Sequence, residues 1–417
     1  MYPTDNNEDT IMAFASFTPS VTGLQAQSQA LSTVSTNIAN ISTVGYRPVQ
    51  TMFQTLLGHT PSTGNTKTGD ASSRVGINGV TAHDRTLISQ QGVVTSTGGN
   101  YDVAIDVNNG FFMVNDPSGN IFYTRAGNFT TRIQDGVAYL IANNGYHVNG
   151  FAATGDNSFA GSPSEIMITA PEIAPTVPTT KINISANVPA NGVDTATYSF
   201  QVYGANNDGN LVNMVFHKDE NTNNLWHVSF SMPNGEITTG TTDVRFASNG
   251  ELLEPETLNF TAVADNGDVN NVTVNIKEMT QFAGDDSIIN ISQDGKASSM
   301  LTRTYIDSFG ILKAQYANGE AINIAKLAIV GFTAPENLIQ ENGTMFRTSN
   351  DVGESFYVLG PDTVTSAILT SQAVESSATS LEEEFSNLII VQRAYTLNTS
   401  SFTTNNEMLQ TVINILS

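Results

Sequence analysis

The sequence of 417 residues contains no cysteine. A chain without thiols cannot form a disulfide, bind zinc through thiolates or use a cysteine nucleophile. The absence leaves the cellular compartment open. It suits a protein that stays unfolded in transit and folds outside the cell without oxidative help.

Charge is scarce and mostly of one sign. Only 13% of the residues are charged, and 39 Asp and Glu residues face 16 Lys and Arg residues, which gives a net charge of −23. Binding to nucleic acid phosphates or to an anionic membrane surface requires basic patches, so we expect neither as a partner. The acidic surface implies solubility and repulsion between copies.

Long hydrophobic runs are also missing. No apolar run reaches the roughly 18 residues that a membrane span requires, so we expect no membrane insertion. The first basic residue is Arg47, and the N-terminus therefore lacks the basic region of a cleaved secretory signal. A hydrophobic content of 39% is enough for packed cores, and the length suggests two to four domains.

Sequence patterns of catalysis and metal binding are not found. The five histidines form no H-x-x-x-H pair, and neither HExxH nor Gly-x-Ser-x-Gly occurs. His217 and His227 lie near predicted strands and could meet across a hairpin, but packed or solvated histidines are the better interpretation. We therefore expect no catalytic residue, no metal site and no cofactor.

The last stretch of the chain, Leu381 to Leu416, is one long predicted helix. It contains neither Pro nor Gly, and its apolar residues recur at alternating steps of three and four, so they share one helix face. A helix of this length spans about 50 Å, which is long for an ordinary globular domain. This face comprises Leu381, Phe385, Leu388, Tyr395, Phe402, Leu409 and Ile413, with the uncharged Gln392 in a gap.

The N-terminal part of the chain offers a partner for this face. Residues 1–11 are polar and acidic and are expected to be disordered, whereas no charged residue occurs from Met12 to Tyr46. Pro19 suits a helix start, and the helical spacing that follows also fits a core helix of a globular domain. The matching face at the far end favours an antiparallel coiled coil of the two terminal helices. The apolar positions are Val21, Leu24, Leu31, Val34 and Ile38.

A recognisable motif follows the N-terminal helix. It resembles the run Asn-Asn-Ile-Ala-Asn-x-x-Thr-x-Gly-Tyr-Lys of the flagellar rod and hook (axial) proteins, with Thr36 in place of the first Asn and Arg47 in place of Lys. Gly45 can end a helix with a positive φ angle, and Asn side chains can satisfy backbone groups near such a turn. The matching residues are Asn37, Ile38, Ala39, Asn40, Thr43, Gly45 and Tyr46.

Residues 75–150 resemble an inner β domain of the same family. Tyr101 to Ile105 alternates polar and apolar residues, as a strand with one buried face does. Two further stretches match the family's inner-domain motifs, and Arg125 is interpreted as part of a structural pairing inside the β domain. The motif residues are Phe111, Phe112, Tyr123, Arg125, Gly127 and Phe129.

Four prolines between residues 151 and 180 mark a domain boundary. Alternating strands follow, separated by turns such as Asn191-Gly192 and Asn234-Gly235, and they predict an antiparallel β domain. Motifs such as Leu225-Trp226 resemble the outer domain of the hook members of the family. A distal rod protein shares the termini but lacks this insertion.

Residues 374–381 resemble the family's C-terminal motif, Leu-Glu-x-Ser-Asn-Val-Asp-Leu. Glu375 and Leu381 match it, while Ala378 and Ser380 replace the Asn and the Asp. Gln372 stands where Gly is usual, so the conformation of this turn is open.

These observations predict a multidomain protein of α plus all-β class, in which a coiled coil of terminal helices carries two nested antiparallel β domains. The expected divisions are an extension at 1–11, a helical domain with linker at 12–74 plus 366–417, an inner β domain at 75–150 plus 300–365, and an outer β domain at 151–299.

The resemblance implies a structural, non-enzymatic subunit of the hook type, which assembles with copies of itself into a flexible tube that transmits torque from rod to filament. It also implies the distal rod protein, the hook cap, the hook–filament junction protein and the flagellar type III export apparatus as partners, and a location outside the cell. A distal rod protein and, as a different class, a secreted β-rich adhesin or enzyme are the alternatives.

Overall fold

The computed structural model describes residues 6–59, 75–154, 158–205, 209–238, 242–361 and 368–416. The chain divides into two compact units: a first unit of residues 1–169, 304–313 and 323–417, and a second unit of residues 170–303 and 314–322. The second unit is thus inserted into the first, with its start at residue 170 rather than at 151. Within the described ranges, no helix is long and apolar enough to cross a membrane.

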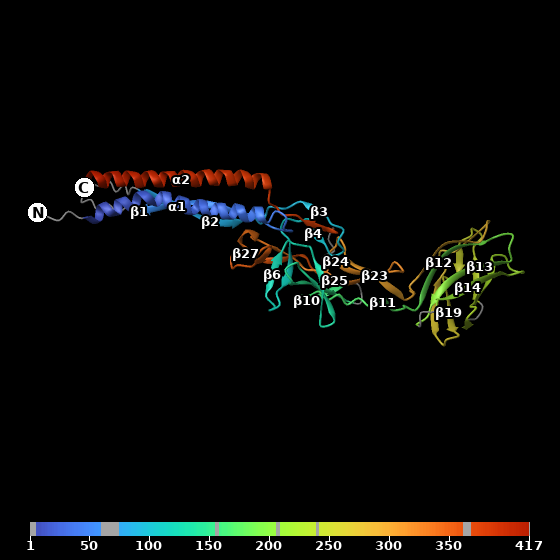
Figure 1. The fold of residues 1–417 in the computed structure, drawn as a ribbon. Coiled ribbons are helices and arrows are strands. Elements are labelled where there is room, and N and C mark those ends of the chain that lie inside the picture. Colours follow the sequence, from blue (N-terminus) through green and yellow to red (C-terminus); the bar gives the residue numbers. More distant parts are fainter. Residues whose placement is uncertain are drawn as a thin grey trace, which may run out of the picture. The chain divides into compact units, whose positions relative to one another are not determined.

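Two long helices of the first unit, α1 (Asn6–Ala39) and α2 (Leu381–Leu416), run side by side in opposite directions (Figure 1). Phe17 contacts Phe402 near one end, and Asn37 hydrogen-bonds Glu384 near the other. The expected antiparallel pairing of the terminal helices is therefore present.

The start of α1 differs from the expectation. The helix begins at Asn6, so residues 6–11 are helical rather than disordered, and residues 1–5 lie outside the described residues. No Pro or Gly occurs between Asn6 and Thr18, so nothing in the sequence interrupts the helix there. Pro19 is not a helix start, because α1 continues through it at the loss of one backbone hydrogen bond.

A long hairpin of β1 (Val49–His59) and β2 (Val75–Thr86) lies along α1 (Figure 1). Thr33 of α1 and Thr51 of β1 both donate hydrogen bonds to the Asp84 carboxylate of β2, at 3.2 and 2.7 Å. The sequence predicts an inner β domain that begins at residue 75, and residues 58–74, which are rich in Gly, Thr and Ser, are predicted to be a linker. The hydrogen bonds join β2 to the helices instead, and residues 60–74 of the linker lie outside the described residues.

The β part of the first unit centres on β5 (Phe111–Asn115), which is hydrogen-bonded to three other strands. Successive side chains of a strand point to opposite faces, and Phe111 and Phe112 accordingly belong to two different hydrophobic cores. Two small sheets, β3–β31 and β4–β30, join the segment before α2 to this part of the chain. The strands and the short helix are β3 (Val94–Ser96), β4 (Val103–Ile105), β6 (Ile121–Thr124), β7 (Thr130–Gln134), β8 (Val137–Ile141), β9 (His147–Ala153), β10 (Phe159–Glu165), β26 (Ile329–Phe332), η1 (Pro335–Asn337), β27 (Ile339–Asn342), β28 (Met345–Arg347), β29 (Ser355–Leu359), β30 (Leu369–Ser371) and β31 (Ala373–Glu375).

Three strands carry the chain between the two units: β23 (Ser299–Ile306), β24 (Ile311–Tyr316) and β25 (Ala321–Leu327). The second unit itself contains two sheets whose alternating buried residues form one core around Trp226 and Phe216. Most pairs are antiparallel as expected, but β12 pairs in parallel with β20 and β21. Its strands are β11 (Ile173–Ala174), β12 (Lys181–Pro189), β13 (Thr195–Tyr203), β14 (Gly209–Lys218), β15 (Leu225–Ser231), β16 (Gly235–Thr238), β17 (Thr242–Phe246), β18 (Leu252–Glu254), β19 (Thr257–Ala264), β20 (Val269–Asn275), β21 (Thr280–Phe282) and β22 (Ser287–Gln293). The fold is thus terminal helices around an all-β middle.

Candidate assembly site on the terminal helices

The face of α1 that meets α2 is made of small and polar residues. Ser20 donates a hydrogen bond to Ser401 across the contact, and Gly23 lies against Asn398, whose amide would be 3.0 Å from any Cβ added at that glycine. Ala26 and Ala30 are buried in the same stretch of α1. Small side chains let two helices approach closely, so larger side chains at these positions of α1 would push the helices apart.

Most residues of the predicted apolar faces lie beside this contact, although Phe402 of α2 packs against Phe17 of α1. On α1, Val34 is buried, Val21 is exposed, and Leu24, Leu31 and Ile38 are intermediate. On α2, Leu388 and Leu409 are intermediate and Gln392 is exposed, while Phe402 lies tilted against Phe17 at 5.3 Å between ring centroids. The most exposed members, at 41–61%, are Leu381, Phe385, Tyr395 and Ile413. Much of the predicted seam is therefore not used within one chain.

A second row of apolar residues on α2 escaped the sequence analysis. We call it the outer stripe: Ile390, Leu397, Met408 and Ile415, which are 56–78% exposed. Spacings of seven, eleven and seven residues keep them on one helix face. The same periodicity that revealed the first face could have revealed this one. α2 thus carries exposed apolar residues on two faces.

Asn37 of the family motif fixes the end of α1. Its side-chain amide donates to the Val49 carbonyl at 2.8 Å and to the Glu384 carboxylate at 2.7 Å, while its oxygen accepts bonds from the Tyr46 hydroxyl and the Val49 N–H. All hydrogen-bonding capacity of the side chain is used. Asn40, in contrast, bonds only locally, to Thr36 and Thr43.

Gly45 adopts the positive φ angle that the sequence predicts, +68°. Its N–H donates to the Glu375 carbonyl at 2.8 Å. A Cβ at this position would lie 2.6 Å from the Ala126 nitrogen, so the turn is pressed against the inner-domain motif. Only glycine meets both requirements.

A buried charge cluster, which we call the Glu375 hub, joins three distant segments. The Glu375 carboxylate pairs with Arg47 at 2.6 Å and with Arg125 at 3.0 Å, and it accepts the Gly92 N–H at 2.8 Å. The charged side chains are at most 1% exposed. Burial lowers the pKa of Arg125 to about 10, although the Glu375 charge opposes this effect. Arg125 therefore has the structural pairing expected, with a partner from the segment before α2.

The aromatic residues of the inner-domain motif pack in the two hydrophobic cores of the β part. Phe112 packs edge-on against Phe129 at 5.0 Å, and Tyr123 against Phe332 at 4.8 Å. A Cβ at Gly127 would lie 1.7 Å from the Val103 carbonyl oxygen, so the backbone passes too closely for a side chain.

The departures from the C-terminal motif are accommodated. Gln372 has a φ of +54°, the region that the usual Gly favours, and its carbonyl accepts the N–H groups of Thr97 and Gly98. Ser380 precedes α2, and its hydroxyl accepts the Glu383 N–H at 3.4 Å, as a helix N-cap does. The turn is therefore built without the glycine.

The structure shows what surrounds the two histidines that the sequence places near a hairpin. His217 and His227 face each other across β14 and β15, as the sequence suggested. His227, however, hydrogen-bonds Asp219 at 3.0 Å and Asp243 at 2.7 Å, and these carboxylates raise its pKa. Among the residues that the structure describes, no group of three His, Asp or Glu side chains could hold a metal ion.

Paired terminal helices with unused apolar faces, tied by a buried hub to one β domain that holds an inserted second one, match the class of flagellar axial proteins expected from the motifs. Four family profiles cover the chain in order. They are described as flagella basal body rod protein (residues 20–47), flagellar hook protein FlgE/F/G D1 domain (104–194), flagellar basal body protein FlaE D2 domain (170–296) and flagellar basal body rod FlgEFG protein C-terminal (370–415).

Relatives that match nearly the whole chain show which flagellar axial proteins this chain is similar to in length and sequence. The flagellar hook protein FlgE of Rhizobium meliloti is 30% identical over 421 residues, which cover 95% of this chain and 97% of the relative. The hook proteins FlgE of Brucella suis and Escherichia coli are 28% and 27% identical, over 95% and 96% of this chain and 97% and 99% of theirs. The chain belongs to the family of flagellar hook proteins. Among solved structures, the hook protein FlgE2 of Helicobacter pylori aligns with 68% of this chain and 99% of its own, at 13% identity and a TM-score of 0.49.

Proposed function

We propose that the protein is the subunit of a bacterial flagellar hook, and that copies polymerise through α1 and α2 into a flexible tube that transmits torque from rod to filament. One observation carries this proposal. Helix α2 pairs with α1 through small residues and leaves two rows of large apolar side chains exposed. Large contiguous apolar surfaces on a soluble chain mark sites of association.

The outer stripe has enough surface to drive association. Its four side chains are mostly exposed in the single chain, and burying a large apolar side chain contributes about 1.5–3 kcal/mol. Burial of the whole stripe against a neighbouring copy is worth on the order of 4–8 kcal/mol before the cost of association. Residues 12–39 of α1 carry no charge, and after Glu384 helix α2 carries only Arg393 and Glu407, which suits close stacking of a chain with net charge −23.

In this proposal the helices form the inner wall of the tube, and the β units lie outside and slide on those of neighbouring copies when the tube bends. The protein acts outside the cell, as a structural part without catalysis. The distal rod protein, the hook cap, the hook–filament junction protein and the flagellar type III export apparatus are its further partners. The full-length hook relatives and the matched D2 segment support the hook over the distal rod alternative.

Leu397→Asp tests the proposal. Leu397 is 71% exposed, so the change should leave the fold of the single chain intact, yet it places a charge in the proposed contact. We expect loss of tubes in sedimentation and electron microscopy. Leu253→Asp is the matched control, because Leu253 is 63% exposed in β18 of the second unit, and it should assemble normally. Normal tubes from Leu397→Asp would contradict assembly through this stripe.

A further inference from the structure

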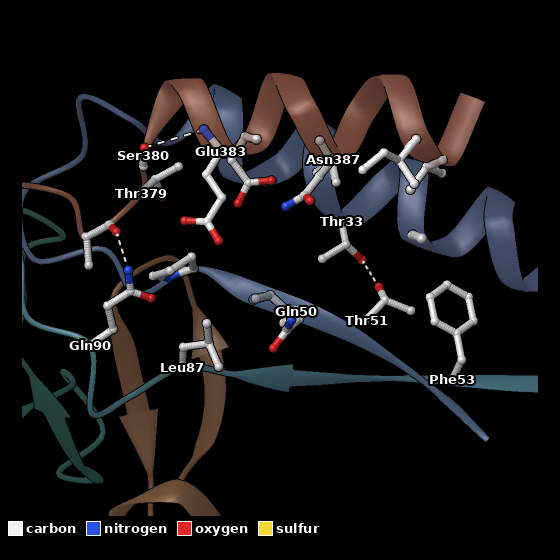
Figure 2. A pocket seen from close by; sticks show the side chains of 18 residues that line it. Thr33, Gln50, Thr51, Phe53, Leu87, Gln90, Thr379, Ser380, Glu383 and Asn387 are labelled. Atoms are coloured by element: carbon white, nitrogen blue, oxygen red, sulfur yellow. Dashed lines mark hydrogen bonds between the residues drawn. The ribbon is translucent and has the colours of Figure 1, made fainter. Parts of the chain in front are cut away.

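A cavity of about 240 Å³ lies in the first unit where α1, α2 and the start of β1 meet (Figure 2). Glu383 and Thr379 border it on the side of α2, and Gln50, Leu87 and Phe53 border it on the side of the hairpin. Its walls mix aliphatic and polar side chains, and the charged groups among them are the two carboxylates of Glu383 and Glu384. The cavity is large enough for one long side chain.

Two features of the cavity point to a missing partner. Glu384, which lines it, is 8% exposed, and among the described residues no cation pairs with its carboxylate. One carboxylate oxygen accepts a hydrogen bond from Asn37. Burial raises the pKa of Glu384, and the neighbouring Glu383 raises it further. Separately, the buried hydroxyl of Thr379 has no hydrogen-bond partner among the residues that the structure describes. Buried charges in proteins are normally paired, so this site lacks a cation.

The terminal helices contain one candidate cation. Helix α1 has no Lys or Arg, and Arg393 is the single basic residue of α2. Arg393 is exposed, and within the described part of the chain it has neither an ion pair nor a hydrogen bond. It follows Glu384 by nine residues, about 14 Å along the helix. Nine residues are also about two and a half turns, so Arg393 lies on the opposite face of the helix, and its guanidinium cannot pair with Glu384 of its own chain.

We propose that the cavity receives the Arg393 side chain of a second copy of this chain, and that Glu383 and Glu384 bind its guanidinium. This inference rests on the proposed function, because it names a contact between copies in the polymer. The aliphatic stem of the arginine would lie along Val34 and Leu87, while Ile389 and Leu397 beside it would cover the cavity rim.

The contact is heterologous, since the donating and the receiving surfaces differ. Every copy gives one arginine and receives one, so the same contact can repeat from copy to copy without closing on a pair. A buried arginine–carboxylate contact also fixes the register between copies. Apolar stripes alone do not specify this register.

The experiment uses charge reversal with rescue in trans. Arg393→Glu and Glu383→Arg should each fail to polymerise alone, with the critical concentration raised at least about tenfold. An equimolar mixture of the two variants should polymerise near the concentration of the unchanged protein, because copies that alternate restore opposite charges at every contact. A pairing within one chain could not be rescued in this way. Arg132→Glu, the same change at an exposed arginine of β7, is the control and should assemble normally.

Glu384→Gln gives a second readout. Glutamine keeps the hydrogen bond from Asn37 but removes the buried charge, so the single chain should become more stable while its polymerisation weakens. A purely structural role would move both in the same direction. Normal assembly of either charge-reversal variant alone, or a mixture that stays unassembled, would overturn the arginine contact. Failure of the unchanged protein to polymerise at all would instead refute the proposed function.

Discussion

Replacing Glu375 by glutamine should unfold the first unit at much lower denaturant. The hub holds two guanidiniums around one carboxylate at 2.6 and 3.0 Å, with all three side chains at most 1% exposed. Glu375→Gln keeps the shape but leaves Arg47 and Arg125 buried without a counter-charge. Breaking a buried ion pair costs about 3–5 kcal/mol, a large part of the 5–15 kcal/mol that stabilises a typical domain.

The chain provides an internal reference for this measurement. Trp226 is the single tryptophan and is buried in the core of the second unit. Its fluorescence should report urea unfolding of that unit alone, and its midpoint should not move. The midpoint of the first unit, followed by amide hydrogen exchange of β3 and β5, should fall by roughly 1–3 M urea.

A second substitution separates charge from packing. Arg47→Met added to Glu375→Gln removes one of the two unpaired cations, so the double variant should be more stable than Glu375→Gln alone. An unchanged midpoint in Glu375→Gln would refute the energetic role of the hub. A double variant less stable than the single one would show that packing, rather than unpaired charge, governs the effect.

Two further predictions concern the ends of the helices. Gln372→Gly should raise the free energy of unfolding of the first unit by about 0.5–1 kcal/mol, because Gln372 has a φ of +54° and glycine adopts that region without strain; chemical denaturation measures this, and a loss of stability would contradict it. Burial raises the pKa of Glu384, so the folded chain favours the protonated acid. The ionised carboxylate destabilises helix pairing fully above the raised pKa, and this destabilisation is lost as pH falls through it. Amide exchange of α1 and α2 below the assembly concentration should therefore slow on acidification relative to Glu384→Gln, which keeps the neighbouring ionisable groups Tyr46 and Glu383. Identical pH profiles of the two proteins would refute this role of Glu384.

The terminal helices and the inner-domain motifs could be predicted from the sequence because they rest on local signals. Apolar periodicity located α2, and the positive φ angle of Gly45 followed from its place after a helix. The face that joins the two helices could not be predicted in the same way. Gly23 and Ala26 let the two helices come close because their side chains are small, not because they are strongly hydrophobic. Apolar periodicity therefore does not identify them and selects Leu24 and Leu31 instead.

Long-range pairing was also beyond the sequence. The pattern of a single sequence gives no signal that Arg125 meets a carboxylate 250 residues away. The hairpin of β1 and β2 was missed for a different reason, because the Gly- and Thr-rich composition of residues 58–74 resembles a linker. The strand that follows these residues pairs with β1 and is hydrogen-bonded to α1.

The Glu375 hub also imposes an order in time. A ribosome completes Arg47 long before Glu375, which follows 328 residues later. Until then the two arginines have no counter-charge, and strand β31, which carries Glu375, does not yet exist to pair with β3. The inner β domain therefore cannot complete its fold while most of the chain is still being synthesised. A nascent subunit therefore lacks this buried contact until nearly the whole polypeptide is available.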